Sequence, residues 1–247
     1  MIQHMRIIDA FCVIGNPQYG GTSATMLMED MQRNGIEKAV IVPDDSYAAV
    51  HNEDGNRLML HLMEHQAGPF IGFASVNPWY GQKASKMLKS FLNSGLRGVY
   101  FKSTVQGFMP DDGMLSPLLD ICAEKKVPAY FHTGTPVNAL PFTVMSQAKR
   151  YPAVNFILGH MGANDYVGDA YAAVKSCENV YLETSYNLTL LIRNAANIRA
   201  DRVLFGSGTP RSRMEFELKK TREAILDDKI LELVLFCNME RVLGDLE

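Results

Sequence analysis

A strand-like run recurs eight times along the chain, and each is followed by a polar or Gly/Pro break and then a segment of helical period. Regular alternation of strand and helix indicates parallel pairing, because each return to the same edge of a sheet needs a crossover. This alternation excludes most other fold classes. The runs rich in β-branched and aromatic residues cover residues 6–14, 38–43, 70–77, 97–103, 127–133, 154–160, 179–184 and 202–207.

The segments between these runs are long enough for crossover helices. Eight such units in 247 residues match the size of a closed barrel. We therefore predict an α/β fold of the (β/α)₈ TIM-barrel type, with residues 1–247 as a single domain. An open doubly wound sheet is the alternative, because periodicity alone cannot prove closure. Residues 229–246 predict one or two helices that close the bottom or side of the barrel. The clearest crossover helices are expected over 23–34, 52–66, 82–93, 111–126 and 214–227.

Composition narrows the function classes. Hydrophobic residues make up 47% of the chain, enough for a sizeable core, and the formal net charge of −3 comes without a basic face. We expect no nucleic-acid partner. No stretch approaches the ~18 apolar residues of a membrane span, and residues 1–14 lack a secretory pattern, so we expect no membrane association and a cytoplasmic location. The four dispersed cysteines suit reduced thiols.

Two histidines end successive predicted strands. In a parallel barrel the carboxyl ends of the strands form the mouth, where active sites lie, so we expect His132 and His160 to lie close together. A glycine follows each of them closely, at 134 and 162, and leaves room beside the imidazole. Imidazole acts either as a neutral metal ligand or as a base with a pKa near neutrality. Other polar residues at strand ends are Asp44, Asp45, Lys102, Glu183, Thr184, Ser185, Ser207, Thr209 and Arg211.

These strand ends resemble those of the amidohydrolase-related barrels that include aminocarboxymuconate-semialdehyde decarboxylase and the resorcylate-type decarboxylases. The resemblance runs along the whole chain and implies an enzyme that hydrolyses or decarboxylates a small carboxylate-bearing molecule. It leaves both monomer and homodimer open, since barrels of this type often pair. The matching motifs are residues 8–10 with Gly15, 72–78, 95–99, 132–134, 158–162, 179–185 and 203–207.

The resemblance also shows that most of the family's metal ligands are replaced. Where the first strand of the family carries His-x-His, this chain has Phe11 and Val13, and Gly208 stands where the catalytic Asp of the eighth strand is expected. His132 matches the fifth-strand ligand, and His160 matches a sixth-strand histidine that acts on the reacting groups. A catalytic zinc site needs about three protein donors. If zinc or another divalent metal binds, His132 and His160 are its candidate ligands; otherwise we expect no cofactor.

Two functions remain open from the sequence. In the first, the chain is an enzyme in which His160 is the acid/base, His132 is its partner, and Lys102 or Arg211 binds the carboxylate of a small-molecule substrate. Without a metal as electrophile, we expect an easier reaction such as lactone opening or isomerisation. In the second, catalysis has been lost, and the barrel binds a ligand or a partner through an apolar pocket. Further substrate contacts are expected from Glu183, Phe11 and Tyr100. Lys102 is expected either to pair with an acid such as Glu183 or to contact an anionic substrate.

Three local patterns have simpler explanations. Residues 61–65 spell H-x-x-E-H, a metalloprotease motif, but helical periodicity places His61, Glu64 and His65 on the solvated face. The glycine-rich residues 15–21 lack a phosphate-binding pattern and predict a loop over the mouth. Cys12 lies between the two replaced ligand positions, and strand alternation turns it away from the barrel interior unless a bulge intervenes.

Overall fold

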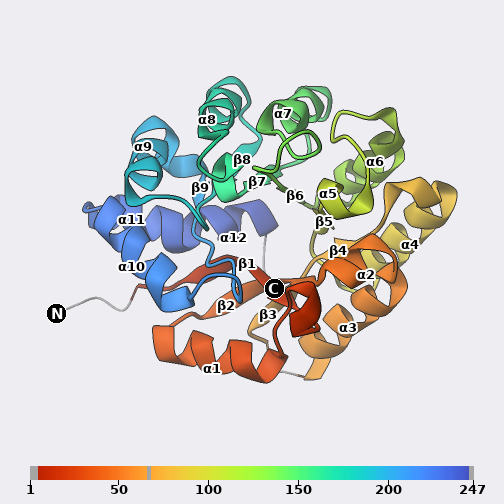
Figure 1. Cartoon of the computed structure of the whole chain (residues 1–247), viewed down its shortest axis with the longest axis horizontal. Coiled ribbons are helices and arrows are strands. Elements are labelled where there is room, and N and C mark those ends of the chain that lie inside the picture. The colour runs from red at the N-terminus through yellow and green to blue at the C-terminus, as the bar shows by residue number, and fades with distance from the viewer. Residues whose placement is uncertain (1–4, 66–67, 245–247) are drawn as a thin grey trace.

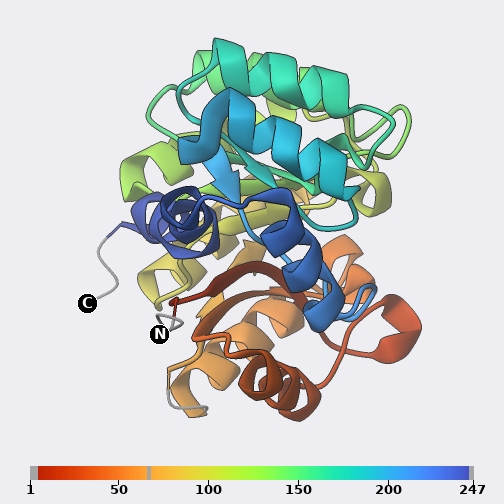
Figure 2. The same cartoon turned by 90° about the vertical axis from the view of Figure 1, so that its left-hand side faces the viewer.

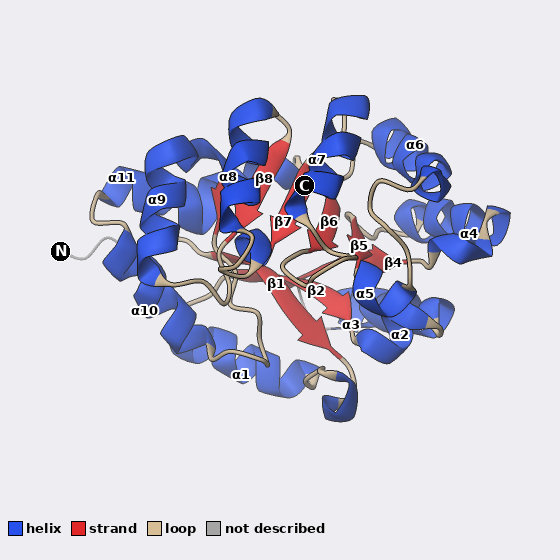
Figure 3. Ribbon diagram, turned by 45° about the horizontal axis from the view of Figure 1, so that its top comes forward, coloured by secondary structure: helices blue, strands red, loops and turns tan. Residues whose placement is uncertain are grey.

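The computed structural model describes residues 5–65 and 68–244 and shows a ring of parallel strands surrounded by helices (Figures 1 and 3). The strands form two ladders, one from β1 to β3 and one from β4 to β9, and within each ladder every strand pairs in parallel with the next along the chain. Within the described residues the strands are β1 (Ile8–Ile14), β2 (Lys38–Pro43), β3 (Phe70–Gly72), β4 (Ala74–Ser75), β5 (Val99–Phe101), β6 (Ala129–His132), β7 (Phe156–Gly159), β8 (Val180–Glu183) and β9 (Val203–Leu204).

The ring is closed between its first and last strands. The backbone N–H of Ala10 donates to the carbonyl of Phe205 at 2.9 Å, and that of Val13 donates to the carbonyl of Thr209 at 2.8 Å. The segment after β9 thus pairs with β1. The prediction of a closed (β/α)₈ barrel is confirmed, and the open sheet is wrong.

The third predicted strand, residues 70–77, is divided into β3 and β4, which is a correction to the predicted bounds. At the break the N–H of Phe73 donates to Ile41 of β2 at 3.0 Å, whereas the next N–H, of Ala74, donates to Gly98 at 2.9 Å. The chain therefore changes hydrogen-bonding partners within two residues, and the two ladders are joined there.

Twelve α-helices of the described chain lie outside the strands. The predicted helix over 111–126 starts only at Ser116, after a turn and a 3₁₀ segment, and Gln66 of the predicted helix over 52–66 lies outside the described residues. The helices are α1 (Ala24–Asn34), α2 (Asp45–Ala49), α3 (Asn52–His65), α4 (Gln82–Asn93), α5 (Ser103–Gln106), α6 (Ser116–Lys125), α7 (Pro141–Arg150), α8 (Val167–Ser176), α9 (Thr189–Arg199), α10 (Met214–Ala224), α11 (Asp228–Glu232) and α12 (Asn238–Leu243).

The C-terminal helices close the end of the barrel opposite the mouth (Figure 2). Between α11 and α12 runs a π-helical segment, Leu233–Cys237. Phe236, Met239 and Val242 pack against the cluster of side chains inside the barrel, and the Asn238 side chain donates to the carbonyl of Val203 at 2.8 Å, where β9 begins. The predicted closure by the tail is confirmed as far as residue 244. No helix of the described residues is long and apolar enough to cross a membrane.

Candidate active site

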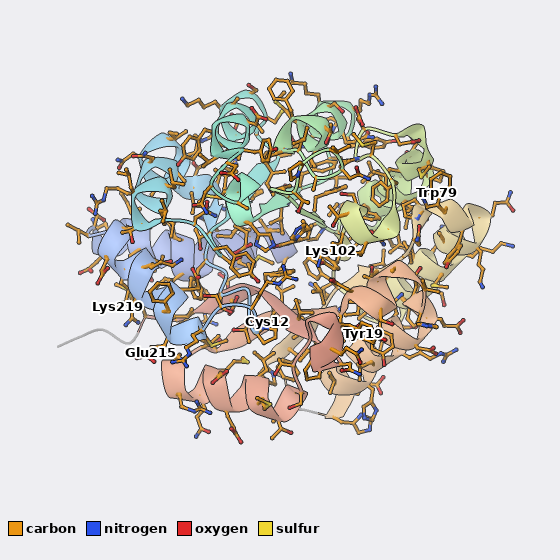
Figure 4. The ribbon with its side chains drawn as sticks, viewed as in Figure 1. Cys12, Tyr19, Trp79, Lys102, Glu215 and Lys219 are labelled. Carbon is orange, nitrogen blue, oxygen red and sulfur yellow. The ribbon has the colours of Figure 1, made fainter. Side chains whose placement is uncertain are left out.

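A narrow cavity of about 20 Å³ lies at the carboxyl ends of the strands. Six of the seven predicted site residues line it, and the seventh, Glu183, does not. Figure 4 shows Lys102 toward the centre of the ring of helices, whereas Trp79 and Lys219 lie at its periphery. The predicted loop over the mouth is confirmed by Gly20. The lining residues are Phe11, Val13, Gly20, Asp45, Tyr100, Lys102, His132, His160, Tyr186 and Arg211.

Larger hollows lie on the outer helices, away from the strand ends. One of about 570 Å³ is a surface groove along α3 and α4 that includes His61 and Glu64 of the H-x-x-E-H motif. His61, Glu64 and His65 are all exposed. Their predicted place on the solvated face is confirmed, and the groove contains none of the strand-end residues.

The two predicted histidines are directly hydrogen-bonded. His160 Nε2 lies 2.9 Å from His132 Nδ1, and the two ring centroids are 4.7 Å apart. His160 is fully buried, and its other ring nitrogen, Nδ1, lies 2.6 Å from Ser185 Oγ. Both nitrogens of His160 are therefore engaged, whereas His132 is only half-buried and directs Nε2 toward Thr135 Oγ1 at 3.4 Å.

Glu183 lies beneath His160 as its acidic partner. Its Oε2 accepts hydrogen bonds from Tyr130 Oη at 2.8 Å, from the His160 backbone N–H at 3.0 Å and from Ser185 Oγ at 3.0 Å, and its Oε1 accepts from the Ser185 N–H at 2.6 Å. Burial alone would raise the pKa of this carboxyl. The hydrogen bond and charge of His160, with the two backbone N–H groups, outweigh burial and lower its pKa.

The expectations for Glu183 as a substrate contact and as the partner of Lys102 are wrong. Its side chain is completely buried and all its contacts are to protein groups. Tyr130 and Ser185 hold it below the cavity wall. Sequence reasoning did not give these two residues their roles, because hydrogen bonds across three strands leave no local pattern in the chain.

The network assigns the imidazole protons. Ser185 Oγ donates to Glu183, so it accepts from His160 Nδ1, which also lies 3.4 Å from the Glu183 carboxylate. A lone pair on Nδ1 would face this negative charge, so the proton belongs there. His160 Nε2 then accepts from His132 Nδ1–H. In neutral His132 the unprotonated nitrogen is Nε2.

The unprotonated nitrogen of the pair that does not bind the other imidazole is therefore Nε2 of His132. Burial, followed by the charges of His160, Lys102 and Arg211, lowers the pKa of His132 well below its ordinary value. The ring is neutral at neutral pH and can accept a proton at Nε2. Its Nδ1 proton can then move to His160, whose positive charge Glu183 would stabilise.

Left-handed backbone conformations hold His160 in place. His160 has φ +65° and the following Met161 has φ +44°, conformations that non-glycine residues rarely adopt. They form part of the short 3₁₀ turn His160–Gly162 after β7. Such conformations persist where surrounding contacts fix them, and they gather at functional sites. At His160 these contacts are the hydrogen bonds of its ring with Ser185 and His132 and of its backbone N–H with Glu183.

A bulge in β1 turns Phe11 into the barrel. Asp9 pairs with Ala39 and Cys12 with Ile41, so β1 has one more residue than β2 between these pairs. Ala10 and Phe11 both join the interior cluster, and Cys12 packs in the outer core. The expected directions of Phe11 and Cys12 are confirmed.

Aromatic rings form the floor of the cavity. The Phe11 ring stacks on Tyr130 with centroids 4.8 Å apart and meets the edge of His160 at 5.2 Å. Tyr100 lies 5.8 Å from the Phe11 ring. The Phe11 side chain has no polar atom, so β1 gives the floor of the cavity an apolar packing surface.

Tyr186 occupies the space above Gly208 and was missed by the sequence analysis. A side chain at Gly208 would place its Cβ 2.5 Å from the Tyr186 ring, and Gly208 itself has φ +68°. Tyr186 Oη donates to the Gly208 carbonyl at 2.6 Å, and its ring lies 4.5 Å from that of His160. Tyr186 has φ +65°, which no sequence pattern indicates for a tyrosine.

We expect Gly208→Ala to lower the free energy of unfolding by about 2 kcal/mol, because it adds the contact with Tyr186 to the left-handed backbone penalty. Gly20→Ala is the matched control. Gly20 also has a positive φ, of +82°, but nothing lies within 4 Å of its added Cβ, so it should cost only about 1 kcal/mol. Urea unfolding measures both values, and equal costs would contradict the predicted contact with Tyr186.

The donors at the mouth do not fit a catalytic divalent metal. Phe11 and Val13 supply no ligand atom, and both ring nitrogens of His160 and of His132 form hydrogen bonds within the protein. No group of three or more His, Cys, Asp or Glu residues in the described chain has an arrangement suited to a metal ion. Since a catalytic zinc needs about three protein donors, the candidate ligands His132 and His160 are too few.

Lys102 pairs with Asp45 and not with Glu183. The Lys102 Nζ lies 2.5 Å from Asp45 Oδ1. Burial lowers the pKa of Lys102, and the Asp45 charge and hydrogen bond oppose this effect. Arg211 lines the same cavity and has no ion-pair partner among the described residues. The mouth therefore presents one uncompensated cation.

The comparison with known families agrees with this architecture. The family model described as amidohydrolase matches residues 11–244. The chain belongs to the amidohydrolase family. No curated protein is a significant match to the sequence.

Solved structures share the fold of this amidohydrolase at low sequence identity. A 5-carboxyvanillate decarboxylase from Sphingomonas paucimobilis has 13% identity and a TM-score of 0.80, covering 97% of this chain and 99% of its own. A dihydroxybenzoic acid decarboxylase from Polaromonas, with bound manganese and the inhibitor 2-nitroresorcinol, has 16% identity, a TM-score of 0.76 and 96% coverage of both chains. A probable 2-pyrone-4,6-dicarboxylic acid hydrolase from Acinetobacter baumannii, with citric acid bound, has 14% identity and a TM-score of 0.74, covering 98% and 100%.

Proposed function

We propose that this amidohydrolase hydrolyses a small carboxylate-bearing lactone or activated ester, with His132 as general base and without a catalytic metal. One observation carries the proposal: His132 Nδ1 is linked by hydrogen bonds to His160, Ser185 and Glu183, which leaves Nε2, 3.4 Å from Thr135 Oγ1, as the nitrogen that can accept a proton. A base whose other nitrogen is fixed by hydrogen bonds is the usual arrangement for proton transfer in hydrolysis.

The reaction follows from these positions. A cavity of about 20 Å³ has room for one water molecule, so the substrate would lie at the mouth, with its carbonyl carbon beside this water. His132 Nε2 takes a proton from this water as its oxygen bonds to the substrate carbonyl carbon. The carbon–oxygen bond to the leaving group then breaks, and the leaving oxygen takes the proton back from His132. Ester and water become acid and alcohol, and the enzyme returns to its starting state.

Charged and polar groups at the mouth would orient the substrate. Arg211 would bind the carboxylate, since its guanidinium lacks an ion-pair partner among the described residues. The Tyr100 hydroxyl would donate to the oxygen that becomes negative in the transition state. Burial holds the pKa of Tyr100 well above its ordinary value, so this hydroxyl keeps its proton.

The activities named for the similar structures support the class of reaction but do not identify the substrate. Structures of similar fold include both decarboxylases of aromatic acids and a probable pyrone dicarboxylic acid hydrolase. We favour hydrolysis because the site combines a neutral base with space for water. It offers no set of metal ligands among the described residues to activate a poor electrophile, so the carbonyl itself must be reactive.

A ligand-binding barrel without catalysis is the second candidate. It is favoured by Phe11 and Val13, which line the cavity with apolar surface where the family's first strand has metal ligands. In that case small acids would stabilise the protein against heat and none would be turned over.

A panel of carboxylated lactones and aryl esters tests the two candidates. We expect hydrolysis that survives dialysis against a chelator, with elemental analysis showing no stoichiometric metal. Loss of activity with the chelator and its return with zinc would contradict the proposed mechanism. Absence of turnover across the panel, together with a rise in Tm on adding the same compounds, would support the ligand-binding barrel.

A further inference from the structure

The Lys102–Asp45 pair lies on the cavity wall beside an unpaired cation. Lys102 Nζ and Asp45 Oδ1 are 2.5 Å apart, and their side chains are 11% and 30% exposed. Both line the cavity with Arg211. The pair cancels its own charge, so Arg211 is the one cation of the lining residues that is left for an anionic ligand.

Gln106 holds the two members of the pair in position. Its side-chain nitrogen donates to the carbonyl of Ala48 in α2 at 3.1 Å, and its oxygen accepts from the Lys102 backbone N–H at 2.9 Å. Gln106 is 3% exposed. The start of α2 is fixed separately, because Asp44 Oδ1 accepts from the backbone N–H groups of Ser46 and Tyr47. The positions of Asp45 and Lys102 therefore do not depend on their ion pair.

The other ionisable groups near the cavity do not change the conclusion that Arg211 is the unpaired cation among the lining residues. His132 is neutral, since its pKa is held well below its ordinary value by burial and neighbouring cations. The Glu183 carboxylate is buried and accepts hydrogen bonds from Tyr130, Ser185 and the His160 N–H. His160 lines the cavity and Glu183 does not.

We infer that Asp45 restricts the ligand to molecules with a single negative charge. The inference rests on the carboxylate-binding part of the proposed function. One carboxylate of a ligand can pair with Arg211. A second carboxylate would have to displace Asp45 from Lys102, or remain close to Asp45 without a cation to pair with. Like charges placed together oppose binding and exclude wrong partners. Asp45 is then a specificity-determining residue, and its removal frees Lys102 for a second carboxylate.

Binding of butyrate and malonate to the full-length protein tests this inference. The two acids are similar in size but carry one and two charges at a pH above the second ionisation of malonate. We expect the wild-type protein to bind butyrate at least ~10-fold more tightly, and Asp45→Asn to reverse the preference by a similar factor. Calorimetric titration at constant ionic strength gives both dissociation constants.

Two further variants complete the test. Asp54→Asn removes an exposed carboxylate from the first turn of α3 and should keep the preference for butyrate, which controls for net charge. Lys102→Met combined with Asp45→Asn should lose the gain in malonate affinity. An unchanged ratio in Asp45→Asn, or no binding of either acid to any variant, would overturn the inference. Because the readout is binding, a failure of hydrolysis alone would leave it standing.

Discussion

Replacement of His132 by glutamine should lower kcat on an active ester or lactone by about 10³-fold, within the range that general-base catalysis contributes. Glutamine keeps a polar side chain near His160 but has no basic nitrogen for the water proton. Initial rates at saturating substrate measure this effect. His61→Gln is the matched control, because His61 is exposed on α3 outside the barrel mouth, and this variant should retain wild-type turnover.

His160→Gln separates a positioning role from direct base catalysis. The charge of His160 is second only to burial among the causes that lower the pKa of His132. Wild-type activity should therefore persist well below pH ~6.5, the ordinary pKa of histidine, and the acidic limb should move to higher pH in His160→Gln. Equal acidic limbs in both proteins, or full activity of His132→Gln, would contradict the assigned roles.

The second large effect concerns Asp9, a completely buried carboxylate beside the bulge of β1. Burial raises its pKa from 3.8 to about 6, although Oδ1 accepts from the N–H groups of Phe11 and Ser207. The folded protein then binds this proton more tightly than the unfolded chain. Stability is lost as pH rises from the unfolded toward the folded pKa, and about two pK units correspond to about 3 kcal/mol.

Asp9→Asn should remove this pH dependence. The amide oxygen can still accept both backbone hydrogen bonds, and the variant has no proton to lose. We expect the free energy of unfolding of wild type, relative to Asp9→Asn, to fall by about 3 kcal/mol between about pH 4 and pH 7. Urea unfolding at several pH values measures it. Asp54→Asn, at an exposed position, should show no such trend; a constant difference for Asp9→Asn would mean that Asp9 is ionised at all these pH values.

The fold could be predicted from the sequence because its pattern is local and repeated. The continuous apolar strand 39–42 and the amphipathic helix over 82–93 are visible in short windows, and the latter matches α4 residue for residue. The break at Phe73 was not visible. It depends on which neighbouring strand accepts each backbone N–H, and that information lies in residues far along the chain.

The sequence predicted which residues form the site better than it predicted what each of them contacts. His132, His160, Lys102 and Arg211 were placed together by the rule that strand ends meet at the mouth, and they do line one cavity. The pairing of Lys102 with Asp45 was missed because it depends on the short helices α2 and α5, which have too few residues for a periodic signal.

Closure of the ring between β1 and the segment after β9 has a consequence for how the chain is made. The hydrogen bonds of Ala10 and Val13 are to Phe205 and Thr209, so the first strand has an open edge until residues 205–209 have left the ribosome. Contacts so distant in sequence form slowly, because a long loop must close before they stabilise it. During synthesis, Ile8–Ile14 is thus the strand most exposed to wrong pairing with other nascent chains.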